Sequence, residues 1–396
     1  MKLEMLRARK GDCLLLHGGT EDDPALVLID GGPAGTYEES LRPRLMRLRE
    51  ERELDDDQPL ILDMVMVSHV DDDHINGIID LFSEIKREAD RGNPPPFKVK
   101  ALWHNSFDDI LGNSEVKAQQ GQFGAASFAP LAEDAADQTE WDAAMLLAGV
   151  GQGQQLRDLA ETLGITPNED FGGSLIQTPD TGKLVRELGG ISFTIVAPRA
   201  EELLKLQRDH DKWLKKKRDK GEPVTAASFL ASLTDTSVAN LSSIVVLAEA
   251  DGRSILLTGD ARTDHVILGL EKTGLVAPGA TMEVEILKMP HHGSDRNVDE
   301  TFLERIRGRS YLFSGNGEHG NPERKTVEML LEAQPDADMN LYFTYSFDEV
   351  DTEREREHKG AAWSDDVHAL GKLIDNARAG ITVHVAGEEG IEVASA

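Results

Sequence analysis

The segment His69–His74 (His-Val-Asp-Asp-Asp-His) concentrates side chains that bind divalent metals. Its two histidines, with Asp71 and Asp73, give four ligand-type groups within six residues. Imidazole and carboxylate are standard metal ligands in proteins. In an extended segment, alternation points His69, Asp71 and Asp73 to one side, and His74 turns inward where a helix begins. The pattern predicts the start of two adjacent metal sites. The alternative is a solvated acidic turn in which Asp73 caps the following helix.

Three further segments place a carboxylate or an imidazole directly after an apolar run typical of a strand. Asp260 ends SILLTGD, His291 and His292 follow EVEILKMP, and His319 lies in GNGEHGNPE after SYLFSG. Rigid strands present functional side chains at their ends. Each of these residues alone is a weak signal, but together with residues 69–74 they predict a metal centre.

Other chemistries find less support in the sequence. Cys13, the single cysteine, lies in an apolar run and is expected in the core. Ser294 follows His292-Gly293 with nothing that marks it as a nucleophile, so a substrate hydrogen bond or a helix cap is the better interpretation. The Gly-rich stretch 149–155 lacks the Lys and Ser/Thr of a phosphate-binding P-loop.

The apolar patterns predict the elements that must position these residues. Helices are expected at 38–53, from Ile75 onward, and at 201–223, 299–307 and 325–333. We also expect a charged loop at 353–360 and a final hairpin within 381–393. Strands are expected at 13–18, 25–30, 60–67, 98–105, 189–198, 282–290, 310–315 and 340–345, with a hairpin at 242–260 that turns at Asp251-Gly252.

Strands therefore fall in two groups, each accompanied by helices, around a middle segment with weak strand signals. Hairpins mixed with single helices favour a layered α/β/β/α arrangement over a doubly wound parallel sheet. We expect residues 1–396 to form one domain, with a largely helical insertion or cap at about 108–235.

The motifs resemble those of a known family. His69-x-Asp71-x-Asp73-His74 is similar to the signature loop of metallo-β-lactamase-fold hydrolases, in the variant where Asp replaces the second His. SHVDDDHINGI, LLTGDA and LKMPHHGS, in this order, resemble the ComEC-type hydrolase domain of competence proteins and its stand-alone relatives, and GDCLLLHGG…LVLIDGG resembles its opening hairpin. The resemblance covers about 1–110 and 238–325. It implies an α/β, metallo-β-lactamase-like αββα sandwich.

The resemblance also implies an assignment of ligands to two metal ions. His69 and Asp71 would bind the first ion. Asp73 and His74 would bind the second, and Asp260 would bridge both. One of His291 and His292 would complete the second site while the other faces the substrate. The family's third histidine of the first site is missing: Asn240 is the closest match, and His104 is either a substitute or a surface histidine.

The implied activity is metal-dependent hydrolysis with Zn²⁺ or Mn²⁺. Two divalent ions bring +4 and the carboxylates of Asp71, Asp73 and Asp260 bring −3, which favours an anionic substrate such as a phosphodiester in a nucleic acid or nucleotide. Asp71 in place of a histidine shifts the preference from zinc toward manganese or magnesium. We expect Asp73, His292 and His319 to act in catalysis, and Ser294, His319 and Asn321 to contact the substrate.

Composition limits the remaining possibilities. The formal charge of −30, from 42 basic and 72 acidic residues, argues against broad binding to nucleic acid. The first residues lack a secretory signal, no stretch approaches the roughly 20 apolar residues of a membrane span, and one cysteine suits a reducing compartment. We therefore expect a cytoplasmic protein without a membrane partner. An esterase or amidase, or an interaction protein that docks a partner through the insertion, are the rival functions; the oligomeric state is not indicated.

Overall fold

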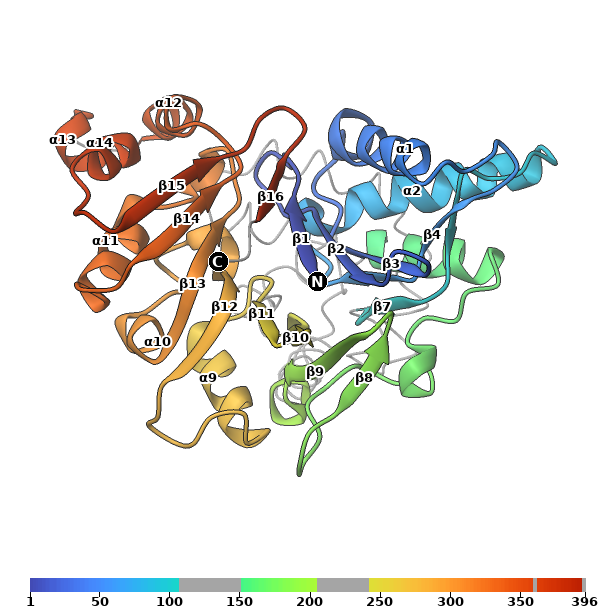
Figure 1. Cartoon of the computed structure of the whole chain (residues 1–396), viewed down its shortest axis with the longest axis horizontal. Helices are drawn as coiled ribbons and strands as arrows, with labels where there is room; N and C mark the ends of the chain where they lie inside the picture. The colour runs from blue at the N-terminus through green and yellow to red at the C-terminus, as the bar shows by residue number, and fades with distance from the viewer. Residues whose placement is uncertain (107–150, 205–241, 359–361, 394–396) are drawn as a thin grey trace, which may run out of the picture.

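The computed structural model describes residues 1–106, 151–204, 242–358 and 362–393 (Figure 1). These residues form a mixed α/β protein with two large sheets. The six-stranded sheet has the order β16-β1-β2-β3-β5-β7. Its strands are β1 (Lys2–Met5), β2 (Leu14–Gly19), β3 (Pro24–Ile29), β5 (Met64–Val67), β7 (Leu102–His104) and β16 (Ile391–Val393).

The eight-stranded sheet has the order β15-β14-β13-β12-β11-β10-β9-β8, and β11 to β15 are parallel neighbours. Its strands are β8 (Val185–Leu188), β9 (Ile191–Ala197), β10 (Val245–Ala250), β11 (Arg253–Leu257), β12 (Met282–Lys288), β13 (Ile306–Phe313), β14 (Met339–Phe343) and β15 (Ile381–Val385). A separate pair joins β4 (Leu60–Leu62) to β6 (Phe97–Val99).

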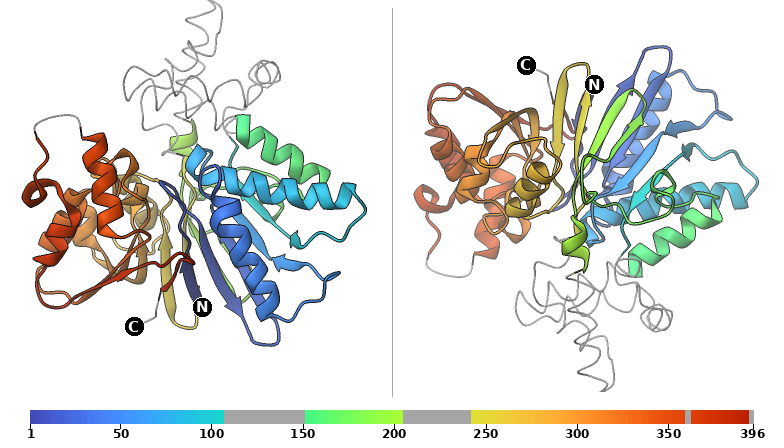
Figure 2. Two further views of the ribbon diagram at one scale, coloured as in Figure 1. Left: turned by 90° about the horizontal axis from the view of Figure 1, so that it is seen from above. Right: turned by 90° about the horizontal axis from the view of Figure 1, so that it is seen from below.

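The helices lie on the outer faces of the two sheets (Figure 2). Beside the six-stranded sheet lie α1 (Arg42–Glu51), extended at its start by a π-helical turn at Tyr37–Leu41, then α2 (Asp72–Asp90) and a helix at 151–162. Beside the eight-stranded sheet lie α9 (Thr263–Lys272), α10 (Glu300–Arg305), α11 (Arg324–Ala333), α12 (Phe347–Glu357), α13 (Asp365–His368) and α14 (Leu370–Asp375). Short 3₁₀ turns occupy Glu169–Phe171, Pro290–Gly293 and Glu318–Gly320.

Three hydrophobic clusters hold these layers together. One lies between the two sheets and joins Leu16 and Met66 of the first to Val246 and Ile286 of the second. The second lies between the six-stranded sheet and its helices, and the third between the eight-stranded sheet and its helices. The layers therefore follow the order helices, sheet, sheet, helices, in which each sheet is buried on both faces.

The carboxyl ends of several strands meet at one edge between the sheets. In the first sheet, β3 and β7 run parallel to β5, so Asp30, Ser68 and the end of β7 follow neighbouring strands. In the second sheet, β11, β12 and β13 are parallel neighbours, so the loops that follow them also leave from one edge. The strands before His291 and His319, β12 and β13, are paired neighbours, so both histidines follow strands that end at this edge.

Most predicted elements are confirmed, but some predictions were wrong. The final hairpin is not a hairpin, because β15 pairs with β14 while β16 crosses to the other sheet and pairs with β1. The predicted strand at 60–67 is two strands, β4 and β5, in different sheets. The strand β1 was not predicted. The expected charged loop at 353–360 is largely helix α12, which a capping box between Ser346 and Glu349 begins.

Part of the expected insertion at 108–235 belongs to the main sheet. Strands β8 and β9 lie within this range and extend the eight-stranded sheet beside β10. The parts 107–150 and 205–241 lie outside the described residues, as do most of the predicted helix at 201–223 and Asn240.

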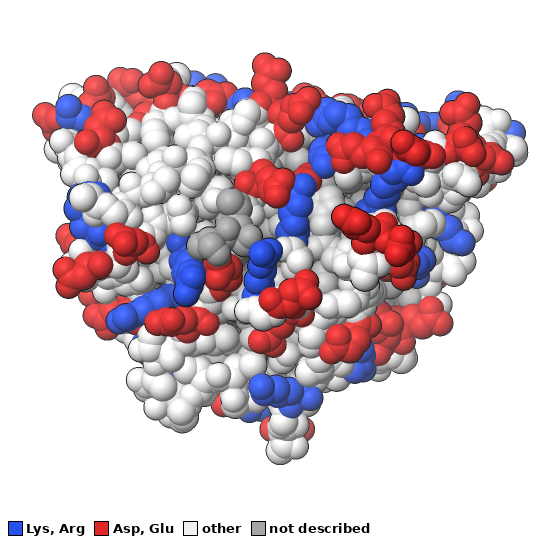
Figure 3. All heavy atoms as spheres, in the orientation of Figure 1, with Lys and Arg blue, Asp and Glu red and all other residues white. Residues whose placement is uncertain are grey.

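The acidic side chains are not collected into one patch on the face that Figure 3 shows. They lie along the outer edge and over much of this face, with Lys and Arg side chains between them. Among the described residues, no helix is both long and apolar enough to cross a membrane.

Candidate metal centre

Asp260 is the carboxylate on which the candidate site converges. It follows β11 through Thr258 and Gly259, and its side chain is buried. Gly259 has a φ of +50°, and a Cβ there would lie 2.9 Å from Cβ of Ser68, so only glycine lets the two loops approach this closely. Its carbonyl accepts a hydrogen bond from the backbone of His291. Gly259 therefore brings three ligand-bearing loops together.

The loop after β5 supplies His69 and His74. The Nε2 atoms of His69 and His74 lie 3.7 and 3.3 Å from the carboxylate oxygens of Asp260. Asp71 lies 3.4 Å from Nε2 of His69, and Asp73 lies 3.8 Å from Nε2 of His74. The structure thus brings these four residues close to one another beside Asp260. The predicted extended alternation was wrong, because α2 already begins at Asp72, and the dipole of its first turn favours acidic residues there.

The loop after β12 supplies His291 and His292, which differ in exposure. Nε2 of His292 lies 3.5 Å from Asp73 and 3.7 Å from Asp260, and the residue is 1% exposed. Nε2 of His291 lies 3.5 Å from Asp260, but its side chain is 31% exposed. Both residues have positive φ, which turns the chain sharply after the strand. His292 is therefore the histidine beside the Asp73–His74 pair, and His291 faces the outside.

Each of these four imidazoles is held at its other nitrogen. Asp30 lies 2.9 Å from Nδ1 of His74, and Ser68 Oγ lies 3.1 Å from Nδ1 of His69. Asn297 Oδ1 lies 2.8 Å from Nδ1 of His291, and Ser314 Oγ lies 2.9 Å from Nδ1 of His292. Metal-binding histidines are characteristically fixed by such a partner at the nitrogen that does not bind the metal. The rings are therefore oriented with Nε2 toward Asp260.

The donor set fits a divalent metal. Nε2 of His69, His74 and His292 and Oδ1 of Asp260 are buried and have no hydrogen-bond partner among the described residues. The four separations between Nε2 atoms and Asp260 are 3.3 to 3.7 Å. Two ligands at about 2.1 Å from a tetrahedral ion lie about 3.4 Å apart, whereas N–H···O bonds are shorter. These atoms are therefore spaced as ligands of a shared ion are.

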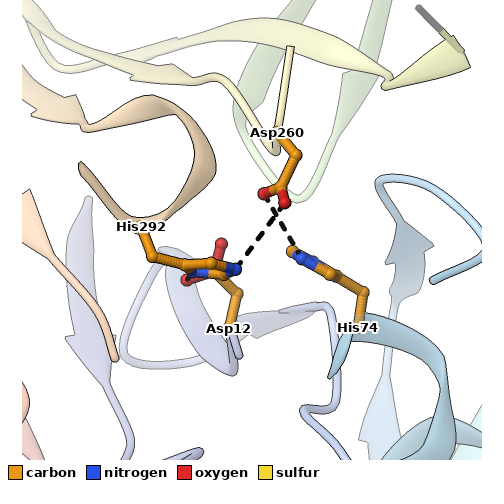
Figure 4. A group of neighbouring side chains, drawn as sticks. All are labelled: Asp12, His74, Asp260 and His292. Carbon is orange, nitrogen blue, oxygen red and sulfur yellow. Dashed lines mark ion pairs between the residues drawn. The ribbon is translucent and has the colours of Figure 1, made fainter. Parts of the chain in front are cut away.

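The tightest group comprises Asp12, His74, Asp260 and His292 (Figure 4). One ligand atom from each lies within 4.8 Å of the others, and all four residues are buried. In Figure 4, His74 and His292 approach Asp260 from opposite sides, from α2 and from the loop after β12. These four residues are close enough to bind a metal ion.

The charges in the cluster are strongly coupled. Burial lowers the pKa of His292, but the carboxylates of Asp260 and Asp12 outweigh it and raise the pKa to about 9. Burial likewise opposes protonation of His74, and Asp260 and Asp30 raise its pKa well above the usual value. Burial raises the pKa of Asp260, yet the surrounding histidines, His291 foremost, hold it well below its usual range. A metal ion bound at this cluster would therefore displace protons.

Three buried charged residues of the site were missed at the level of sequence. Asp12 and Asp30 lie in the opening motifs GDC and IDGG, and Lys288 is the one basic residue in the apolar strand β12. A charge inside a buried strand requires a partner, which was a usable signal for Lys288. Asp30 adds a fourth carboxylate beside Asp71, Asp73 and Asp260, and the Lys288 ammonium offsets the charge of Asp12.

The outer predicted residues lie around this centre. His319 follows β13 and has a φ of +58°; its backbone N–H donates to Glu357, 2.7 Å away. His319 is exposed, and the charges of Lys10, Asp73 and His291 act on its ring. Ser294 and Asn321 are buried, and Oδ1 of Asn321 has no hydrogen-bond partner in the described part of the chain.

His104 was expected either as a substitute ligand or as a surface histidine. It is 2% exposed, so the surface interpretation was wrong. Its ring lies near Val70 and Gly153, under the helix at 151–162. Cys13 is buried as predicted, and burial raises the pKa of its thiol.

Comparison with known proteins gives one partial similarity. No protein-family profile matches the chain. A segment of 98 residues, 24% of the chain, is 29% identical to ComE operon protein 3 of Bacillus subtilis (strain 168). The matched segment spans only 12% of the length of that protein. The chain thus has a weak, partial relative among competence proteins.

Proposed function

We propose that this chain is a metal-dependent hydrolase with a metallo-β-lactamase-like αββα fold, and that it cleaves a phosphodiester. The observation that carries the proposal is the convergence of four imidazole Nε2 atoms on Asp260. Three of these nitrogens are buried without a hydrogen-bond partner among the described residues. Leaving such polar atoms unsatisfied costs about 1–3 kcal/mol each, and bound divalent metal would satisfy all of them.

Two further observations support this proposal. The layers of helices, sheet, sheet and helices agree with the implied fold, and the ligands lie on loops at the edge where the sheets meet. The partial similarity to ComE operon protein 3 agrees with the ComEC-type motifs in the sequence.

The residues divide into two ligand groups. His69 and Asp71 would hold one ion, and Asp73, His74 and His292 a second, with Asp260 within reach of both groups. Divalent ions so held supply the charge that acidifies water and stabilises both oxygens of a displacement, the chemistry of two-metal nucleases and phosphatases. Asp30, Ser68, Asn297 and Ser314 fix the imidazole rings and so keep the Nε2 atoms in place.

In this proposal, His319 contacts the substrate from the rim of the site. Partial desolvation of its ring and the charge of Lys10 lower the pKa of His319, which favours the neutral imidazole. A neutral imidazole donates one N–H to an anionic oxygen of the substrate. The backbone bond to Glu357 holds the loop that carries it.

Metal analysis combined with a substrate panel tests the proposal. Purified protein should contain divalent metal and should hydrolyse bis(p-nitrophenyl) phosphate, or a short single-stranded oligonucleotide, when Mn²⁺ is supplied. Because carboxylates outnumber histidines at the first ion, Mn²⁺ should activate at least as well as Zn²⁺. Asp260→Ala should abolish the reaction. Hydrolysis of p-nitrophenyl acetate alone would favour an esterase, and wild-type protein that binds neither metal would contradict the proposal.

A further inference from the structure

Lys288 carries a positive charge into the interior next to the metal centre. It is the last residue of β12 and is 1% exposed. Its Nζ lies 2.7 Å from Oδ2 of Asp12 and donates to the carbonyl of Met289 at 3.0 Å. A buried ammonium and carboxylate that pair in this way cost several kcal/mol to desolvate. The hydrolytic scheme above assigns no role to Lys288.

The partner carboxylate, Asp12, is fixed from two further directions. Its backbone N–H donates to the carbonyl of Asp73, and a Cβ at the preceding Gly11 would lie 1.9 Å from that carbonyl oxygen. The loop before β2 is therefore pressed against the loop that carries Asp73. Through Lys288, the same residue is tied to the opposite sheet.

The second oxygen of this carboxylate, Oδ1, faces His292. Oδ1 of Asp12 lies 3.4 Å from Nδ1 of His292, beside the hydroxyl of Ser314 at 2.9 Å from the same nitrogen. Nε2 of the ring lies 3.5 Å from Asp73 and 3.7 Å from Asp260. The two ring nitrogens point in different directions, so Asp12 stands behind the ring and Asp260 in front of it. A carboxylate behind Nδ1 favours the tautomer that carries its proton there, which leaves the Nε2 lone pair for a metal.

Asp12 therefore differs from the other members of the four-residue group. One of its oxygens is committed to an ammonium ion, and the other contacts the nitrogen that faces away from the shared centre. A direct metal ligand needs an oxygen that meets the ion together with Nε2 of His292. The charge of Lys288 opposes a cation at that oxygen.

We propose that Asp12 and Lys288 are a positioning pair: the ammonium holds the carboxylate, and the carboxylate orients His292 and fixes its tautomer for metal binding. The inference rests on the metal site of the proposed function. It assigns to Lys288 the role of keeping Asp12 behind the imidazole and out of the coordination shell.

Metal-binding measurements on three variants test this pair. Asp12→Asn and Lys288→Met each leave a buried charge unpaired, so both should lower the thermal stability of the metal-free protein. The double variant Asp12→Asn/Lys288→Met restores neutrality and should recover most of that stability. Its affinity for Mn²⁺, measured by calorimetric titration, should nevertheless stay about 10- to 100-fold below wild type, the usual loss when a ligand's supporting carboxylate is removed.

A coordination spectrum separates positioning from ligation. The visible spectrum of the Co²⁺-loaded Asp12→Asn variant should match that of wild type, because the coordinating atoms are the same. Lys2→Met and Glu392→Gln, which open an ion pair of 2.8 Å on the surface, serve as matched controls and should change neither affinity nor spectrum. A changed Co²⁺ spectrum would show that Asp12 is a ligand. A double variant that binds Mn²⁺ like wild type would show that the pair is only structural.

The outcomes also separate this inference from the proposed function. Wild-type protein that hydrolyses nothing in the panel, while the double variant binds Mn²⁺ more weakly than wild type, would refute the hydrolase and support the positioning pair. Active wild-type protein, together with a double variant that binds Mn²⁺ as tightly as wild type, would support the hydrolase and refute the positioning pair.

Discussion

His74 and His292 present the same nitrogen to Asp260 but are held in different ways. His74 lies in the first turn of α2, and its Nδ1 is 2.9 Å from Asp30. Asp30 in turn accepts hydrogen bonds of 2.7 Å from the backbone N–H and the hydroxyl of Ser68. His292 lies in a left-handed turn after β12, and behind it stand Ser314 and the carboxylate of Asp12.

The difference lies in which parts of the fold each support requires. Asp30, Ser68 and His74 all follow strands or begin the helix of the six-stranded layer, so one layer can assemble this half of the centre. Ser314 supports His292 from the end of β13 in the same sheet, but the carboxylate of Asp12 lies in the loop before β2, so this second support exists only when both sheets are packed together. We infer that the His74 half is preformed and that the His292 half depends on the inter-sheet core.

Asp260 is shared by both halves, so its removal should have the largest effect. Asp260→Ala should lower the affinity for Mn²⁺ by more than about 100-fold, because loss of a ligand exceeds the 10- to 100-fold loss of a supporting residue. Bound metal after purification, measured by plasma mass spectrometry, provides the test. Asp264→Ala, which removes an exposed carboxylate paired with Arg262, is the control. Wild-type metal content in Asp260→Ala would disprove the shared centre.

Removal of the carboxylate behind His74 should have the next largest effect. Asp30→Asn keeps the shape but weakens the hydrogen bonds from Ser68 and His74, so we expect a 10- to 100-fold loss of Mn²⁺ affinity and about 1–3 kcal/mol of stability. Calorimetric titration and urea unfolding measure the two quantities, with the exposed Asp22→Asn as control. Mutations that loosen the inter-sheet core should lower Mn²⁺ affinity by weakening the Asp12 support of His292, and they should leave the Asp30 support of His74 in place.

The candidate ligands could be predicted from the sequence where they lie close together in the chain or directly follow a strand. Residues 69–74 are compact in sequence, and Asp260, His291 and His292 follow strands whose apolar runs are clear. Their convergence then follows from parallel neighbours sharing one edge of a sheet.

The remaining features required knowledge of which strands face each other. The pairing of Asp12 with Lys288 joins the two sheets, and no local sequence pattern around either residue predicts the other as its partner. The wrong prediction of a final hairpin has the same cause. Residues 381–393 alternate as a hairpin does, but β16 pairs with β1 at the edge of the other sheet. The extended reading of residues 69–74 failed because the acidic residues also suit a helix N-terminus.

His319 offers a smaller perturbation that leaves both halves of the centre intact. His319→Ala should leave metal content and stability unchanged and lower kcat by about tenfold, which corresponds to about 1.4 kcal/mol of transition-state stabilisation. Steady-state kinetics on the phosphodiester substrate provides the measurement. An unchanged kcat would make His319 a surface residue, and loss of metal would mean that the ligand assignment at the rim is wrong.

The smallest predicted effect concerns a carboxyl group behind the His292 loop. The backbone N–H of Glu323 donates to the carbonyl of Gly293, and burial together with the charge of Asp295 raises the pKa of Glu323 to about 7. The folded state therefore favours the protonated form. Stability should fall as the pH rises from about 4.5 through about 7, and it should remain at the lower level above that range.

Glu323→Gln tests whether the negative charge of Glu323 destabilises the loop that carries His292. The variant should be more stable than wild type by about 1 kcal/mol at pH 8, because it removes a partly buried charge that faces Asp295, and the partial exposure of the group limits the gain. At pH 4 the two proteins should unfold at nearly the same urea concentration, because Glu323 is then mostly protonated in both states. Glu328→Gln, which removes the partner of Arg324 on the same helix, should show no such gain at pH 8. Equal stability of Glu323→Gln and wild type at pH 8 would show that the ionised Glu323 does not destabilise this loop. The two halves would then differ only in the residues that support their histidines.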